Sequence, residues 1–214
     1  MNASLDSYPQ IAEVIEEISA LHKEFSWEIR DILTYNLSKS VSRVVNEQGI
    51  DKDFQTLINE YKTVLNINTV KFLEIQNRFP SVRFRIKQGE SISEKLFYYK
   101  KVHENGGIPI NKCLNDFLGF RLMVSNSDNI CTKIESDESL KESISRMYPR
   151  TEGSYSGFHL YFKNGNNKFF PWELQIWDVT NAVQNELSHK DHKQKRKYIS
   201  LPQNYRDGNL EKEG

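Results

Sequence analysis

Residues 82–87, VRFRIK, alternate apolar and cationic side chains, and this alternation marks a change of pattern in the chain. Before Pro80 the apolar residues recur at helical spacing, whereas here every second residue is apolar. A period of two is typical of a β-strand with one buried face. The segment is therefore predicted to be a strand whose second face carries Arg83, Arg85 and Lys87.

Three later segments have strand patterns in which polar residues interrupt the apolar ones. They are GFRLMVS (119–125), SGFHLYFKN (156–164) and KFFPWELQIW (168–177), and a Gly-Asn turn is predicted to join the last two as a hairpin. Because successive side chains point to opposite faces of a sheet, the apolar residues leave a second face for the polar ones. We call this the charged face, and it is predicted to carry Arg83, Arg85, Lys87, Arg121, His159, Glu173 and Gln175.

The first part of the chain has a helical pattern. Apolar residues recur at helical spacing within 11–21, and less regular spacing predicts two more helices within 26–47 and 52–78. Residues 1–79 are therefore predicted to form an N-terminal helical region.

Helices are also expected among the strands. The segment SISEKLFYYKKVHE (91–104) is predicted to be a helix with Ser91 available as its cap, and 127–146 to contain one or two short helices. A longer helix is expected within 179–198. Residues 80–199 then form a sheet-containing domain, and 200–214 a loosely held tail.

The composition limits the partners of this protein. Lys and Arg total 29, as do Asp and Glu, so an attraction to nucleic acid or membrane must come from a local patch. Cys113 and Cys131 are expected to be reduced. The sequence has neither a signal-peptide pattern nor an apolar run of membrane-spanning length, so a cytoplasmic location without membrane attachment is expected.

Two interpretations of the charged face stay open on the residues alone. The first is a solvated outer face of a two-layer α/β domain. The second is a polyphosphate site, because Arg and Lys bind phosphate oxygens and sparse carboxylates bind the accompanying divalent metal. The number of cations at alternating positions favours the second interpretation.

Four motifs in order resemble the synthetase domain of the RelA/SpoT family, which contains alarmone synthetases and related toxins. They are RFRIKQGESISEK (83–95), DFLGFRL (116–122), GSYSGFH (153–159) and WELQIWDVTNAVQNELSH (172–189). The resemblance implies an α+β fold with a mixed sheet of about four to five strands flanked by helices, as in nucleotidyltransferases. It also implies an ATP pyrophosphokinase, which transfers the β,γ-diphosphate of ATP to a ribose 3′-hydroxyl with Mg²⁺ as cofactor.

The same resemblance implies a role for each motif position. ATP would be bound by Arg85, Lys87, Ser91, Lys95 and Arg121, the last beside the adenine. The catalytic and Mg²⁺-binding residues would be Asp116 and Glu173, and the acceptor-binding residues Tyr155, His159 and Gln175. From the residues alone, alternatives remain: Asp116 as a helix cap or turn residue, Tyr155 as a surface aromatic, and His159 as a structural histidine.

The acceptor divides this family. Alarmone synthetases use GDP or GTP, whereas some toxin members modify the 3′-terminal adenosine of tRNA. Ser156 stands where a basic or polar residue usually follows the tyrosine of the acceptor loop, which disfavours a free nucleotide. Only 25 residues follow His189, so the C-terminal helices and tetramer of small alarmone synthetases are not expected.

A basic patch in the segment HKDHKQKRK also favours RNA. It consists of Lys190, Lys193, Lys195, Arg196 and Lys197. These cations either contact an RNA backbone or form a solvated helix end. Three hypotheses follow: a toxin that modifies the tRNA acceptor end and inhibits translation, with a possible antitoxin partner; an alarmone synthetase using GDP or GTP; and an inactive RNA-binding or regulatory relative.

Overall fold

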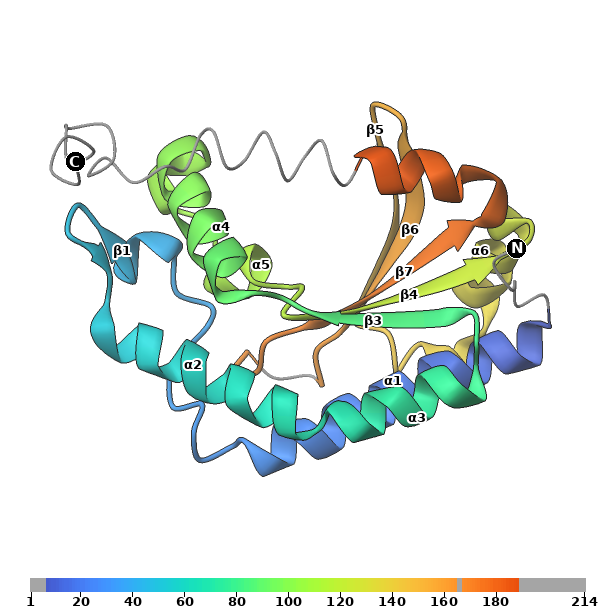
Figure 1. Cartoon of the computed structure of the whole chain (residues 1–214), viewed down its shortest axis with the longest axis horizontal. Helices are drawn as coiled ribbons and strands as arrows, with labels where there is room; N and C mark the ends of the chain where they lie inside the picture. Colours follow the sequence, from blue (N-terminus) through green and yellow to red (C-terminus); the bar gives the residue numbers. More distant parts are fainter. Residues whose placement is uncertain (1–6, 165–166, 189–214) are drawn as a thin grey trace, which may run out of the picture.

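The computed structural model describes residues 7–164 and 167–188, in which helices pack around a twisted β-sheet (Figure 1). The helices are α1 (Tyr8–Glu28), α2 (Lys52–Ile67), α3 (Thr69–Arg78), α4 (Gly89–Val102), α5 (Ile110–Cys113) and α6 (Ser127–Ser136), followed by helical residues 182–188. The strands of the sheet are β3 (Val82–Ile86), β4 (Leu118–Val124), β5 (Arg146–Glu152), β6 (Tyr155–Phe162) and β7 (Trp172–Asp178). Short 3-10 turns are η1 (Val41–Arg43), η2 (Glu104–Gly106), η3 (Glu138–Leu140) and η4 (Val179–Asn181), and a small hairpin pairs β1 (Val45–Asn46) with β2 (Gly49–Ile50).

The five strands lie in the order β3-β4-β7-β6-β5. β4 and β7 are parallel, and the other neighbouring pairs are antiparallel. The prediction of an α+β fold with a mixed sheet of four to five strands flanked by helices is therefore confirmed. The four predicted strands correspond to β3, β4, β6 and β7.

One face of the sheet is buried under the N-terminal helices, which run beneath it in Figure 1. The face is apolar because the strands alternate, and Phe120, Trp172 and Leu174 are at most 1% exposed. Trp172 contacts Phe25 of α1 and Phe72 of α3, with ring centroids 5.2 and 5.7 Å away. The helices therefore fill this face and leave the opposite, charged face available for a site.

Two local predictions were wrong. Residues 26–47 do not form one helix: α1 ends at Glu28, and turns lead to η1 and β1. Ser91 does not cap α4, because this helix already begins at Gly89, and its N-cap residue is Gln88.

One strand, β5, was not predicted. Pro149 lies in its middle, and a proline argues against a strand because it cannot donate a ladder hydrogen bond. β5 is an edge strand, however, paired with β6 alone, so it tolerates the missing donor. The predicted Gly-Asn turn of the β6–β7 hairpin lies outside the described residues.

The remaining global predictions have mixed outcomes. α6 and η3 provide the short helices expected within 127–146. Cys113 and Cys131 are buried and are not joined in a disulfide. No helix among the described residues is long and apolar enough to cross a membrane. The division into regions 1–79, 80–199 and 200–214 stays a prediction.

The aromatic contacts between α3 and the sheet lead to a stability prediction. Phe72 is fully buried against Phe84, Phe120 and Trp172, so Phe72→Ala should lower the free energy of unfolding by about 3–5 kcal/mol. The neighbouring Leu73 is 41% exposed, and Leu73→Ala should cost less than about 1 kcal/mol. Denaturant unfolding of both variants measures the difference; equal losses would contradict the proposed packing.

Candidate active site

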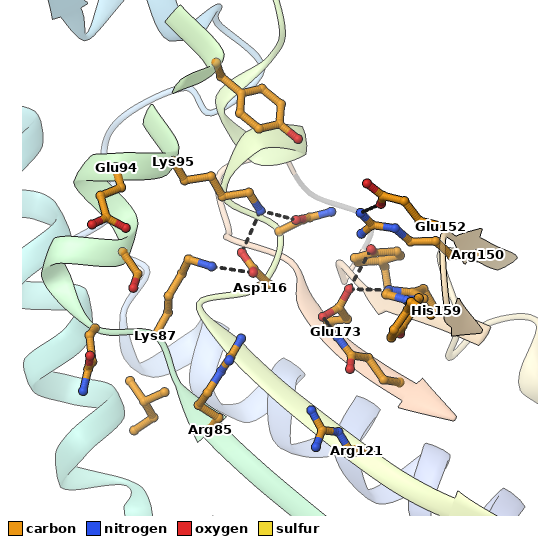
Figure 2. A pocket seen from close by; sticks show the side chains of 18 of the residues that line it. Arg85, Lys87, Glu94, Lys95, Asp116, Arg121, Arg150, Glu152, His159 and Glu173 are labelled. Atoms are coloured by element: carbon orange, nitrogen blue, oxygen red, sulfur yellow. Dashed lines mark hydrogen bonds and ion pairs between the residues drawn. The ribbon is translucent and has the colours of Figure 1, made fainter. Parts of the chain in front are cut away.

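A pocket of about 460 Å³ lies on the charged face and is lined by residues of α4, of the strands and, through Glu186, of the helix at 182–188. Figure 2 shows the part of it beside α4 and the sheet. All ten residues predicted to bind ATP or acceptor, or to act in catalysis, line it: Arg85, Lys87, Ser91, Lys95, Asp116, Arg121, Tyr155, His159, Glu173 and Gln175. The structure thus brings together residues from four motifs, and their individual roles stay predictions. Arg83 does not line the pocket; its guanidinium donates to the backbone oxygens of Pro80 and Val82.

The strand register explains this convergence. Arg121 of β4 pairs with Gln175 of β7, which pairs with His159 of β6. Two residues further along these strands, on the same face, Gly119 pairs with Glu173. Because paired residues share a face, the polar side chains predicted from strand parity form rows across the sheet.

Asp116 lies just before β4 and forms the centre of a cationic cluster. Its two oxygens lie 2.6 Å from Lys87 Nζ and 2.9 Å from Lys95 Nζ, and Asn115 also accepts a hydrogen bond from Lys95. Burial alone would raise the pKa of Asp116, but the two ammonium groups hold it well below the usual range. The side chain is therefore an ionised carboxylate between two cations.

Glu173 on β7 is the second carboxylate of the pocket, and its side chain is buried. His159 Nδ1 lies 2.7 Å from its Oε1, which also accepts a hydrogen bond from the Tyr161 hydroxyl at 2.8 Å. Gln175 Nε2 donates to Oε2 at 2.8 Å. Burial opposes the charge, but the contacts with His159 and Tyr161 hold the pKa of Glu173 below its usual value.

Tyr155 and His159 are connected in the floor of the pocket. The Tyr155 hydroxyl lies 2.7 Å from His159 Nε2, and both side chains are at most 5% exposed. Burial raises the pKa of Tyr155 to about 12. Tyr155 is thus a buried, hydrogen-bonded residue rather than a surface aromatic, and its predicted stacking on an acceptor base stays a prediction.

Arg121 of β4 is held by two contacts. Its guanidinium carbon lies 3.5 Å from the centroid of the Trp177 ring, a cation–π contact, and the side chain pairs with Glu186 of the helix at 182–188. Glu186 therefore orients a residue predicted to border adenine, although the sequence interpretation assigned it no site role.

Several residues that line the pocket were not predicted from the sequence. Three of them, Tyr148, Arg150 and Glu152, belong to β5, which was not predicted because Pro149 argues against a strand. Tyr161 lies two residues after His159 on β6, so its side chain points to the same face. The alternation that placed His159 on the charged face could therefore also have placed Tyr161 there. The basic patch (Lys190, Lys193, Lys195, Arg196 and Lys197) and His189 lie outside the described residues.

The two carboxylates suit Mg²⁺ bound together with a phosphate ligand. No group of three or more His, Cys, Asp or Glu residues in the described chain could hold a metal. Protein-bound Mg²⁺ often takes only one or two carboxylates, with substrate phosphates and waters completing its shell. At Gly119 an added Cβ would lie 3.9 Å from Glu173 Oε2, at ordinary contact distance, so residue 119 places no side chain against this oxygen.

Comparisons with known proteins add similarity to solved structures. No protein-family model matches the sequence, and no curated protein matches it. Among solved structures, the chain is similar to small alarmone synthetase 1 from Bacillus subtilis, with a TM-score of 0.40 and 20% sequence identity. The match covers 73% of this chain and 86% of that one.

The pairing of Asp116 with the buried Lys87 and Lys95 gives the second prediction. Asp116→Asn leaves two buried ammonium groups without their carboxylate and should lower the free energy of unfolding at pH 7 by about 3–5 kcal/mol. The pKa of Asp116 is lower in the folded protein than in the unfolded chain. The wild-type protein should therefore stay more stable than the variant down to about pH 4, and the difference in free energy of unfolding should decline at lower pH.

Denaturant unfolding between pH 3 and 8 measures this effect. Asp31→Asn is the control, because the Asp31 side chain is 84% exposed and its substitution should change stability little. A loss below about 1 kcal/mol for Asp116→Asn at pH 7 would contradict a buried ion-pair cluster.

Proposed function

We propose that this protein is an ATP pyrophosphokinase whose pocket transfers the β,γ-diphosphate of ATP to a ribose 3′-hydroxyl. The observation that carries the proposal is that two carboxylates, the buried Glu173 and the 15% exposed Asp116, line one pocket together with Lys87 and Lys95, which both pair with Asp116. Transfer of a charged phosphoryl group needs little covalent chemistry from the protein; it needs positioning and electrostatic stabilisation.

The donor half of the site is formed by β3, α4 and β4. Lys87 and Lys95 end beside Asp116, and Arg85 and Ser91 line the same pocket, so a polyphosphate meets cations on one wall. In our proposal the ammonium groups of Lys87 and Lys95 bind phosphate oxygens of ATP in place of Asp116. The Asp116 carboxylate can then bind Mg²⁺. Arg121, whose guanidinium already stacks on one ring, borders the adenine.

Asp116 and Glu173 are the residues proposed to hold Mg²⁺. When bound, the ion would offset negative charge on the transferred group and on the departing AMP. Lys87 and Lys95 provide further positive charge at the same place.

The acceptor half is formed by β6 and β7. The acceptor 3′-oxygen attacks the β-phosphorus, the bond from that phosphorus to the α,β-bridging oxygen breaks, and AMP leaves with this oxygen. The proton of the hydroxyl passes to the Glu173 carboxylate, which His159, Tyr161 and Gln175 hold in place. Gln175 and His159 are proposed to contact the acceptor, and Tyr155 to border its base.

The preferred acceptor is the 3′-terminal adenosine of tRNA, and its modification would inhibit translation. Ser156 and the basic patch support this choice over a free nucleotide. Such a toxin would require a neutralising antitoxin. GDP or GTP is the second candidate, which Arg150 favours, because this pocket cation could receive an acceptor phosphate. A catalytically inactive relative is disfavoured by the complete set of charged residues.

The acceptor is tested by offering deacylated tRNA, GDP and GTP separately to the protein with ATP labelled in the γ-phosphate. Label should enter tRNA, and Glu173→Gln should reduce transfer by about 10²–10⁴-fold because the proton acceptor is lost. The control Glu135→Gln changes an exposed residue of α6 and should keep full activity. Label only in GDP or GTP would replace the tRNA proposal by the second candidate, and no transfer at all would refute both.

The basic patch has its own test. Four phosphates neutralised on a single strand predict a slope near −3 for log K against log salt, from about 0.7 per phosphate. Changing Lys195, Arg196 and Lys197 together to Glu should weaken tRNA binding and flatten this slope, while ATP binding stays unchanged. A filter-binding titration over several salt concentrations measures both; equal loss of tRNA and ATP binding would contradict a role restricted to RNA.

A further inference from the structure

Trp177 lies on the charged face and takes no direct part in the proposed reaction. It follows Glu173 and Gln175 as the third residue of β7 whose side chain points to this face, and it is fully buried. Around it is a small cluster, separate from the main core, that contains Met123, Tyr155 and Ala182. The helices of the main core pack on the other face of the sheet. The Trp177 indole is therefore not part of that core, and it contacts residues of the pocket.

The indole makes two different contacts with pocket residues. Its face supports the Arg121 guanidinium, 3.5 Å from the ring centroid. Its Nε1–H donates to the Tyr155 hydroxyl at 3.1 Å. One rigid side chain therefore touches the residue proposed to border adenine and the residue proposed to border the acceptor base.

The second contact continues to the proposed catalytic carboxylate. The Tyr155 hydroxyl lies 2.7 Å from His159 Nε2, and His159 Nδ1 lies 2.7 Å from Glu173 Oε1. Arg121 and Glu173, which act on different substrates in the proposed reaction, are thus connected through buried side chains. Side-chain networks of this kind hold their members in one geometry when each hydrogen bond is made.

Gly157 supplies the space for this arrangement. A Cβ at this position would lie 2.9 Å from Trp177 Cδ1 and 3.1 Å from the Tyr155 hydroxyl. The first distance is too short for a real contact, so any larger residue must displace the indole or the strand. The absence of a side chain at Gly157 therefore allows Trp177 and Tyr155 to stay in contact.

We infer that Trp177 is a positioning residue that sets the Arg121 guanidinium and the Glu173 carboxylate relative to one another. The catalytic consequence rests on the proposed pyrophosphokinase function, whereas the hydrogen bond from Trp177 to Tyr155 is testable without any substrate. Residues that orient a metal-binding or catalytic group from behind typically change activity by 10- to 100-fold when altered.

The kinetic test compares Trp177→Phe, Tyr155→Phe and the double variant with Trp27→Phe. Trp27 is 69% exposed on α1, so its substitution controls for the loss of an indole. We expect Trp177→Phe to lower kcat about tenfold and to raise the KM for ATP, and Tyr155→Phe to lower kcat with the KM for ATP unchanged. Because both residues act on Glu173 through the same series of hydrogen bonds, the kcat of the double variant should equal that of the less active single variant. Losses of kcat that multiply would overturn the inference.

A substrate-free measurement separates failure of this inference from failure of the proposed function. In ¹H–¹⁵N NMR spectra of the full chain, Trp27→Phe and Trp177→Phe assign the indole N–H signals. Tyr155→Phe should then shift the Trp177 signal and speed its hydrogen exchange, leaving the Trp27 signal in place. An unchanged Trp177 signal would overturn the inference even in an active enzyme. If Trp177→Phe does not fold, Gly157→Ala serves instead of it for assignment, because it displaces the same indole.

Discussion

The parallel pairing of β4 with β7 is the constraint on which the site depends. These strands are more than forty residues apart in sequence, and their register sets Gly119 opposite Glu173 and Arg121 opposite Gln175. Strand alternation then assigns the apolar side chains to the helical face and the charged ones to the other. A shift by one residue would exchange the two faces, so the buried core also fixes the geometry of the pocket.

The charges of this pocket are difficult to explain by stability alone. Replacing buried ion pairs by well-packed apolar residues is often neutral or stabilising, because desolvation opposes their attraction. Here two lysines converge on Asp116, and three polar side chains converge on Glu173. Such paired charges suit a site that exchanges its internal partners for those of a ligand. The Asp116 cluster is thereby both a structural element and, in our proposal, the receptor for phosphate and metal.

Strand parity was the part of the sequence with the greatest predictive value. It grouped Arg121, His159, Glu173 and Gln175 because a buried apolar face leaves little freedom in the orientation of a strand. It could not give the order of strands or the pairing of Asp116 with Lys95, which depends on where α4 packs. β5 was missed because proline is compatible with a strand only at an edge, and edges are a property of the assembled sheet. Buried partners such as Trp177 were overlooked for a similar reason: an apolar ring on the charged face reads as core until its neighbours are known.

The central claim concerns which bond of ATP is broken, and product analysis addresses it most directly. The protein is incubated with unlabelled deacylated tRNA, GDP or GTP, each offered separately, and with ATP carrying label in either the α- or the γ-phosphate. The account predicts that AMP retains the α-label and that the acceptor gains the γ-label in equal amounts. Release of ADP would indicate simple phosphate transfer, and α-label in the acceptor would indicate nucleotidyl transfer; either result would contradict the proposed pyrophosphokinase.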